Sequence, residues 1–194
     1  MLRLGILASH QGTNFQTIAD ACNDGGLKAR VVALICNNSH APVMDRAARL
    51  DIPAYHLSSA THPQQGALDT AIHDRLTSAS VQLVVLAGYM KKLGPKVLEG
   101  FNGRIINVHP SLLPKHGGQG FYGMRVHEAV IAAGDRETGA TVHQVTADYD
   151  EGDIIRQESI CVTATDTPNT IAEKVHTIEY RLLLETIREF TETL

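Results

Sequence analysis

Several features typical of secreted, membrane and metal-binding proteins are missing from this chain of 194 residues. Its three cysteines, an odd number, lie far apart at positions 22, 36 and 161 without a Cys-x-x-Cys spacing. This favours free thiols in a reducing compartment over disulfides or a zinc site. None of its apolar runs approaches the roughly eighteen residues of a membrane span, and the N-terminus lacks the basic start and apolar stretch of a secretion signal. We therefore expect a cytoplasmic protein without a membrane partner.

Clusters of basic residues and metal-ligand spacings are missing too. Lysine and arginine number 17 against 21 aspartates and glutamates, the net charge is −4, and tryptophan is absent. Nucleic-acid binding needs a basic patch, so we expect no nucleic-acid partner and favour a small-molecule ligand. The ten histidines include no His-x-His or His-x-x-x-His pair, and we therefore expect a site without metal.

What the first half of the chain does contain is an alternation of short apolar runs with amphipathic stretches. The apolar runs predict strands at 2–8, 29–36, 54–57, 81–87 and 104–108, and the amphipathic stretches predict helices at 14–23, 41–50, 63–77 and 95–99. A strand–helix repeat of this kind builds a parallel sheet with helices on both faces. The length favours a single domain, residues 1–194, that buries roughly 70% of its unfolded surface.

The second half changes character. It predicts a helix at 126–133, two longer strands at 140–147 and 154–163, and a long amphipathic helix at 171–190. The segment 115–123 holds four glycines and is typical of a long mobile loop. The predicted fold class is thus α/β, an open, mostly parallel sheet extended by antiparallel strands in the C-terminal half.

Two polar residues at the end of a predicted strand indicate chemistry. Asn107 and His109 are two positions apart, so on a strand they point to the same side, and the acidic loop 148–153 follows about forty positions later. A carboxylate such as Asp150 beside His109 would raise the pKa of the imidazole and hold one tautomer. Such a group stabilises an oxyanion and moves a proton, as acyl transfer requires. On local spacing alone, a capped turn with a half-buried histidine explains the residues equally well.

Three segments together favour the catalytic interpretation of these residues over the capped turn. Residues 107–114 (Asn-Val-His-Pro-Ser-Leu-Leu-Pro), 134–143 with Gly-Asp and Thr-Gly-Ala-Thr-Val-His, and 150–155 (Asp-Glu-Gly-Asp-Ile-Ile) resemble the folate-dependent formyltransferases over nearly the whole chain. The resemblance implies a Rossmann-like fold and transfer of the formyl group of 10-formyltetrahydrofolate to an amine. Within the family the chain is most similar to members that formylate glycinamide ribonucleotide in de novo purine (IMP) biosynthesis.

The loop after the first strand is a candidate phosphate site, because free N–H groups and the helix dipole meet there. A plain helix cap around Gly12 is an equal alternative. A dinucleotide site fits less well, since the loop lacks Gly-x-Gly-x-x-Gly. The family commonly has Gly-x-Gly-(Ser/Thr)-Asn at this place. Gly12, Thr13 and Asn14 match that pattern, and His10 replaces its first glycine, which puts the conformation of the loop in question.

The resemblance implies further contacts. It assigns to the ribose and glycinamide end Gly88, Met90, Pro110, His176 and Glu179, and to the folate Met90, Lys91, Lys92, Leu93, Ala147, Asp148, Tyr149 and Asp150. From the residues alone, 86–93 is also compatible with a strand end carrying two solvated lysines. His176 and Glu179 are three positions apart, a spacing that equally fits a surface pair.

The expected mechanism has no covalent enzyme intermediate. Asn107 and protonated His109 stabilise the tetrahedral intermediate, and Asp150 assists proton transfer. A 10-formyltetrahydrofolate hydrolase would use the same chemistry with water, but such enzymes carry an extra N-terminal module, and the first strand here begins at residue 2. A methionyl-tRNA formyltransferase would add a basic C-terminal domain. A non-catalytic nucleotide-binding module gives no reason for the three polar residues. The sequence leaves open whether the protein is a monomer or a homodimer.

Overall fold

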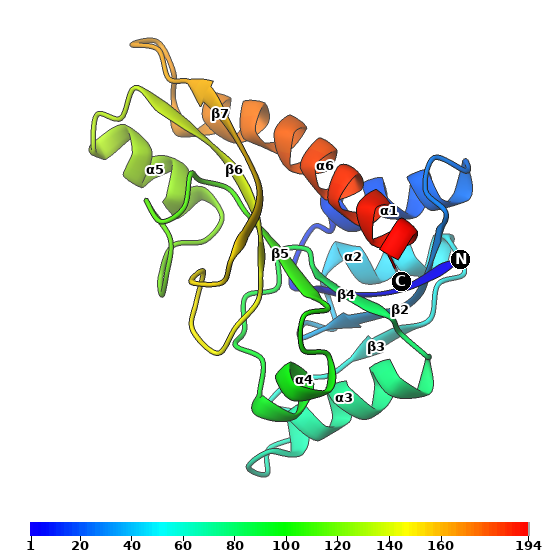
Figure 1. The fold of residues 1–194 in the computed structure, drawn as a ribbon. Coiled ribbons are helices and arrows are strands. Elements are labelled where there is room, and N and C mark those ends of the chain that lie inside the picture. The colour runs from blue at the N-terminus through cyan, green and yellow to red at the C-terminus, as the bar shows by residue number, and fades with distance from the viewer. Residues whose placement is uncertain (194) are drawn as a thin grey trace.

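The computed structural model describes residues 1–193, which form one seven-stranded sheet with strand order β3-β2-β1-β4-β5-β6-β7 (Figure 1). The strands are β1 (Leu2–Ala8), β2 (Ala29–Cys36), β3 (Ala54–His56), β4 (Leu83–Leu86), β5 (Ile105–His109), β6 (Glu137–Gln144) and β7 (Ile154–Cys161). The first five pair in parallel, and β6 and β7 add antiparallel pairs. The predicted fold class is confirmed.

Helices cover both faces of this sheet (Figure 1). They are α1 (Thr13–Asn23), α2 (Pro42–Arg49), α3 (Ala67–Ser78), α4 (Pro95–Gly100), α5 (Met124–Ala132) and α6 (Pro168–Thr193). One buried cluster joins the sheet to α1, α2, α5 and α6, and a second joins it to α3 and α4. The central strands are therefore apolar on both sides, as strands of a covered parallel sheet must be.

The predicted bounds of α3, β6 and α6 were the least accurate, and α3 begins at Ala67, four residues after its predicted start. Strand β6 begins at Glu137, three residues before the predicted start, because its polar first residue pairs with Cys161 of β7 rather than joining the apolar run. Gly139 allows the close approach of these strands, since a Cβ there would lie 1.9 Å from the carbonyl oxygen of Glu158. Helix α6 is longer than predicted at both ends.

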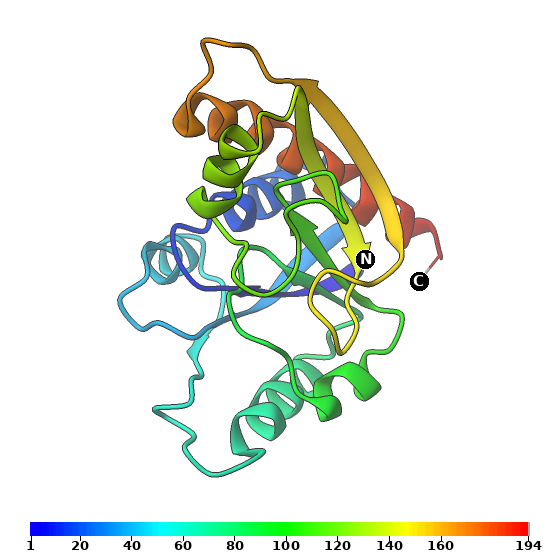
Figure 2. The same cartoon turned by 90° about the vertical axis from the view of Figure 1, so that its left-hand side faces the viewer.

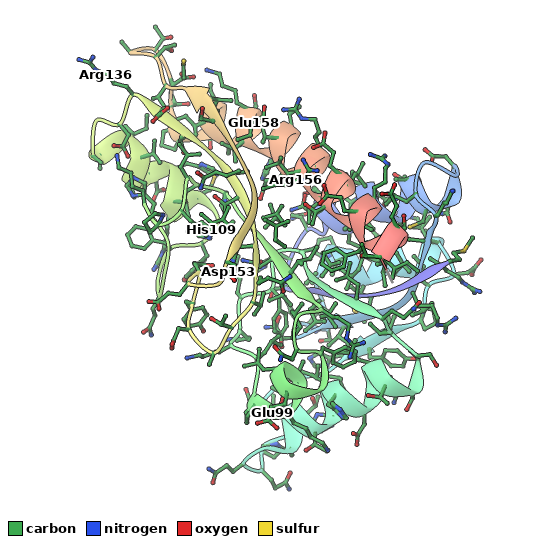
Figure 3. All side chains as sticks on the ribbon, viewed as in Figure 1. Glu99, His109, Arg136, Asp153, Arg156 and Glu158 are labelled. Carbon is green, nitrogen blue, oxygen red and sulfur yellow. The ribbon has the colours of Figure 1, made fainter. Side chains whose placement is uncertain are left out.

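Ion pairs on the surface join β7 to α6 (Figure 3). Arg156 pairs with Glu185 and Glu189, and Arg181 pairs with Glu158. The edge strand is thereby fastened to the long helix that packs along the sheet. Among residues 1–193, no helix is both long and apolar enough to cross a membrane.

Candidate active site

A cleft of about 640 Å³ lies where the carboxyl ends of β1, β4 and β5 meet. This is where open α/β sheets collect ligands, and the volume suits small molecules. Figure 2 shows the face with α5 and the loop between β5 and α5 in front of the sheet. All the site residues predicted from the sequence line this cleft: Gly12, Thr13, Asn14, Gly88, Met90, Lys91, Lys92, Leu93, Asn107, His109, Pro110, Ala147, Asp148, Tyr149, Asp150, His176 and Glu179.

At the centre of the cleft, Asn107 and Asp150 are joined by a residue for which the sequence indicated no role, His143. The β5–β6 register places His143 directly opposite Asn107. His143 Nδ1 lies 2.8 Å from the Gln144 carbonyl oxygen, which accepts only, so this nitrogen carries the proton. In the neutral ring, Nε2 is then the acceptor for the Asn107 amide, 3.0 Å away. His143 thus fixes which way the Asn107 side chain is turned.

His109 has an acceptor at each ring nitrogen. Nε2 lies 2.7 Å from the His116 carbonyl oxygen and therefore donates to it, and Nδ1 lies 3.4 Å from Asp150 Oδ2. Figure 3 labels His109 between α5 and the β6–β7 loop. Burial lowers the pKa of His109, and the nearby Asp150 opposes that shift without reversing it. Asp150 thus raises the pKa of His109 as expected, but the net shift is downward, because desolvation outweighs the carboxylate.

Asp150 is held as a carboxylate. Burial works to raise its pKa, but the contacts that stabilise its charged form, the Gly118 N–H among them, outweigh burial and lower the pKa overall. The Gly118 N–H donates to Oδ2 at 2.9 Å. Asp150 has a φ of 57°, a left-handed conformation that aspartate tolerates better than most residues. The site at rest therefore combines a charged carboxylate with a neutral imidazole.

The phosphate loop leaves main-chain donors free at the start of α1. Gly12 is the N-cap residue with a φ of 71°, and no side chain caps the helix. The plain helix-cap interpretation therefore lacks its capping side chain, and the first N–H groups of α1 have no partner within the helix. His10 is not among the residues with positive φ, so replacing a glycine by histidine there requires no strained backbone.

Ser9 fastens this loop to neighbouring strands. Its hydroxyl donates to Asn37 Oδ1 at 2.6 Å and accepts from the Met90 N–H at 2.8 Å, and its own N–H donates to the Gly88 carbonyl at 3.1 Å. The ends of β1, β2 and β4 are thus joined by this one serine. Sequence reasoning missed this link, because a serine beside a loop carries no distinctive pattern.

Glu179 lies on α6 beside Asn14 and His176. It is 5% exposed, and burial raises the pKa of its carboxyl to about 8, with the Asn14 amide opposing the shift. His176 Nε2 is 3.6 Å away and more exposed, and burial lowers its pKa. The surface-pair interpretation fails for Glu179, which is buried at the cleft.

The opposite end of the cleft is lined by residues 90–93 and 147–150. Leu93 is buried, and Lys92 lies 3.7 Å from Asp148 and 5.5 Å from the centre of the Tyr149 ring. Tyr149 is exposed, so this wall presents an aromatic surface to the mouth of the cleft.

Two more histidines join the site without having been predicted. His116 Nε2 lies 2.7 Å from Asp135 Oδ2, which anchors the start of the loop whose carbonyl holds His109. His127 on α5 is buried at the cleft, and burial lowers its pKa to about 4. The signal for His127 was present, since it is a polar residue on an otherwise apolar buried face of α5.

The centre of the site therefore suits a mechanism without a covalent enzyme intermediate. The Asn107 amide and the His109 ring supply hydrogen-bond donors, as stabilisation of a developing oxyanion requires. Asp150 supplies a negative charge that stabilises the His109 ring when that ring takes up a proton. Within residues 1–193, no group of three His, Cys, Asp or Glu side chains is arranged to hold a metal ion.

Comparison with known proteins agrees with this chemistry. The family model for formyl transferases matches residues 2–187, and the chain belongs to that family. The predicted family is confirmed, and the chain is an enzyme of one-carbon transfer, which implies a formyl donor.

Three proteins similar to this chain are formyltransferases with one kind of substrate. The chain is 38% identical over 192 residues to a phosphoribosylglycinamide formyltransferase from Haemophilus influenzae, covering 99% of this chain and 88% of the relative. It is 32% identical over 189 residues to the enzyme of that name from Bacillus subtilis, covering 97% and 94%. The solved structure of glycinamide ribonucleotide transformylase 1 from Symbiobacterium toebii superposes with a TM-score of 0.93 at 38% identity, covering 100% of this chain and 89% of that one.

Proposed function

We propose that this enzyme transfers the formyl group of 10-formyltetrahydrofolate to the amine of glycinamide ribonucleotide, a step of de novo purine biosynthesis. The observation that carries the proposal is that Asn107, His109 and Asp150 meet at the centre of a cleft with a free-donor loop at one end. The relatives named phosphoribosylglycinamide formyltransferase support the choice of substrate.

Two donors stabilise the reacting oxygen. As the substrate amine attacks the formyl carbon, negative charge develops on the formyl oxygen. The Asn107 amide, whose 3.5 Å contact with Asp150 is long and weak, provides one N–H. The His109 Nε2–H, which the His116 carbonyl accepts in this structure, provides the other. Because the pKa of His109 is lowered, the ring acts as a neutral donor at rest, and proton uptake follows the development of charge.

Asp150 assists the proton transfer. The amine loses a proton as its bond to the formyl carbon forms, and the folate nitrogen gains one as its bond to that carbon breaks. The carboxylate, charged and 3.4 Å from His109 Nδ1, stabilises the imidazolium that this exchange transiently forms. Asp150 helps to carry the proton from the amine to the folate nitrogen, directly or through one water.

The two substrates occupy opposite ends of the cleft. Gly12, Thr13 and Asn14 bind the phosphate, and Gly88, Met90, Pro110, His176 and Glu179 border the ribose and glycinamide. The folate lies along Met90, Lys91, Lys92 and Leu93 on one wall and Ala147, Asp148, Tyr149 and Asp150 on the other. Main-chain groups read a flat pterin edge well, so few side chains there need be specific.

The same proposal includes the domain organisation and setting expected from the sequence. We take residues 1–194 as a single formyltransferase domain, because all seven described strands join one sheet. The partners are small molecules, without nucleic acid or membrane, and the location is cytoplasmic. A monomer and a homodimer are both compatible with it.

One assay tests the reaction. The protein is incubated with 10-formyltetrahydrofolate, with and without glycinamide ribonucleotide, and the loss of the formyl group is followed. We expect loss only when the amine is present, with formylated ribonucleotide as the product. Loss at the same rate without the amine would instead identify a hydrolase, and no loss in either mixture would reject both activities.

A further inference from the structure

Two consecutive carbonyl groups of the phosphate loop are held by α2. The His10 oxygen accepts the Val43 N–H at 3.2 Å, and the Gln11 oxygen accepts Arg46 Nε–H at 2.8 Å. Gly12 also packs on α2, since a Cβ there would lie 2.3 Å from Val43 Cγ2. One side of the loop is thus pressed against α2, while the other lines the cleft.

These bonds decide where the loop N–H groups point. In a planar trans peptide the N–H is directed opposite to the preceding C=O. Because the His10 and Gln11 carbonyls point to α2, the Gln11 and Gly12 N–H groups point away from it, to the cleft side. Neither N–H has an acceptor among residues 1–193. Together with the first N–H groups of α1, they form a row of donors suited to an anion.

Arg46 stands behind this row and does not line the cleft. Its NH1 donates to Gln16 Oε1 on α1 at 3.2 Å, and Gln16 Nε2 donates to Asp20 Oδ1 at 2.8 Å. The half-buried Arg46 side chain extends from α2 and bridges the loop, through the Gln11 carbonyl, to Gln16 of α1. Its charge lies on the far side of the peptide whose N–H faces the cleft.

We propose that Arg46 is a positioning residue for the phosphate of the ribonucleotide substrate. It holds the Gln11–Gly12 peptide in the orientation that presents the Gly12 N–H, without touching the ligand. The inference rests on the proposed function, because it takes the phosphate as the group bound at the loop. Without Arg46 this peptide loses the hydrogen bond that fixes its carbonyl, so the phosphate contact of the Gly12 N–H weakens while the folate end is unchanged.

The test uses Arg46→Met, which keeps an unbranched apolar stem as far as the position of Nε and removes the donors, with Arg49→Met as the matched control on the exposed side of α2. For Arg46→Met we expect the KM for glycinamide ribonucleotide to rise roughly tenfold, as for loss of one hydrogen bond to a charged group. The KM for the folate and the turnover at saturation change far less. Arg46→Lys, which retains the charge and one donor, recovers part of the loss.

A second readout isolates the phosphate. Inorganic phosphate should inhibit Arg46→Met roughly tenfold more weakly than the wild type. The dephosphorylated substrate, glycinamide ribonucleoside, should be used equally by both. A matching loss on the ribonucleoside, or unchanged inhibition by phosphate, would overturn the inference. If Arg46→Met does not fold, Arg46→Lys carries the same comparison.

Binding without catalysis separates this inference from the proposed reaction. The Gly12 amide resonance is followed while inorganic phosphate is added to the wild type and to Arg46→Met. Tighter titration of the wild type supports the role of Arg46 even if no formyl group reaches glycinamide ribonucleotide. Identical titrations overturn it even if the transfer assay succeeds.

Discussion

At the phosphate end of the cleft the groups that face a ligand are main-chain N–H groups of residues 11–14, whereas at the catalytic end they are the side chains of Asn107, His109 and Asp150. The first end belongs to the parallel half of the sheet and depends on a glycine and on α2. The second end belongs to the junction with the antiparallel strands and depends on burial and on His143.

This difference predicts that the two ends of the cleft are sensitive to different kinds of substitution. A main-chain site tolerates many changes of side-chain chemistry but not a Cβ that blocks or rotates a peptide. A buried side-chain site is disrupted by the exchange of one atom, because every member sets the charge or orientation of another. Substitutions at the two ends should therefore affect different kinetic constants.

The largest effect is expected at the catalytic end. Asp150→Asn removes the charge beside His109 Nδ1 with little change of shape, and His109→Ala removes a donor to the oxyanion. Each should lower turnover at saturating substrates by at least about a hundredfold. Circular dichroism checks that the fold is kept. Asp153→Asn, an exposed residue of the same loop labelled in Figure 3, is the matched control and should retain full turnover.

Asn107→Asp should be as harmful as these changes, because it replaces a donor by a charge that repels both the oxyanion and Asp150, 3.5 Å away. Near-normal turnover of any of the three variants would remove that residue from the mechanism and weaken the contrast between the two ends.

A smaller and more selective effect is expected at the phosphate end. Gly12→Val places a branched side chain at a φ of 71° and against Val43, so the KM for glycinamide ribonucleotide should rise more than about tenfold while the folate is affected little. Gly66→Val is the control, since Gly66 is also an N-cap residue with a φ of 74° but has open space around it. Equal losses for both substrates would indicate general unfolding and count against a phosphate site.

The segment 116–123 joins the two ends, and we expect it to close over the ribonucleotide. Phe121 and Tyr122 are 37% and 44% exposed, which leaves apolar surface for a ligand to cover. Cleavage in limited proteolysis should slow severalfold when glycinamide ribonucleotide is bound, because ordering protects the chain. A static loop, with Phe121 resting on the His116 ring as in this structure, would be cut at the same rate with and without the ligand.

The smallest effect concerns Glu179. Because its pKa is raised from 4.5 to about 8 in the folded protein, its ionisation opposes folding. The wild type should lose stability as the pH rises from about 4.5 to about 8, and Glu179→Gln should not. The variant should therefore melt a few degrees higher than the wild type at pH 8.5 and close to it at pH 4. A pH-independent difference between the two melting temperatures would contradict the buried, protonated carboxyl.

Local sequence predicted most of the first half well and the second half less well. The bounds of β1 and β2 match their apolar runs, because strands buried on both faces are apolar along their whole length. The predicted start of β6 was too late because an antiparallel strand can begin with an exposed polar residue such as Glu137. Loops at the strand ends placed the predicted site residues in segments 12–14, 88–93 and 107–110, whereas those at 147–150, 176 and 179 were assigned from the family resemblance. The roles of all of them stay proposals.

The sequence by itself determined the α/β class, the cleft at the strand ends and the Asn107–His109 pair, because helix and strand periodicity and the alternation of side chains along a strand are local properties. Only the tertiary structure decided the protonation of His109, the turn of the Asn107 amide by His143 and the orientation of the Gln11–Gly12 peptide. Each depends on burial or on a partner far along the chain, such as Arg46, which lies 35 positions from the carbonyl it holds. Desolvation and contacts of this kind arise only once distant segments have packed together.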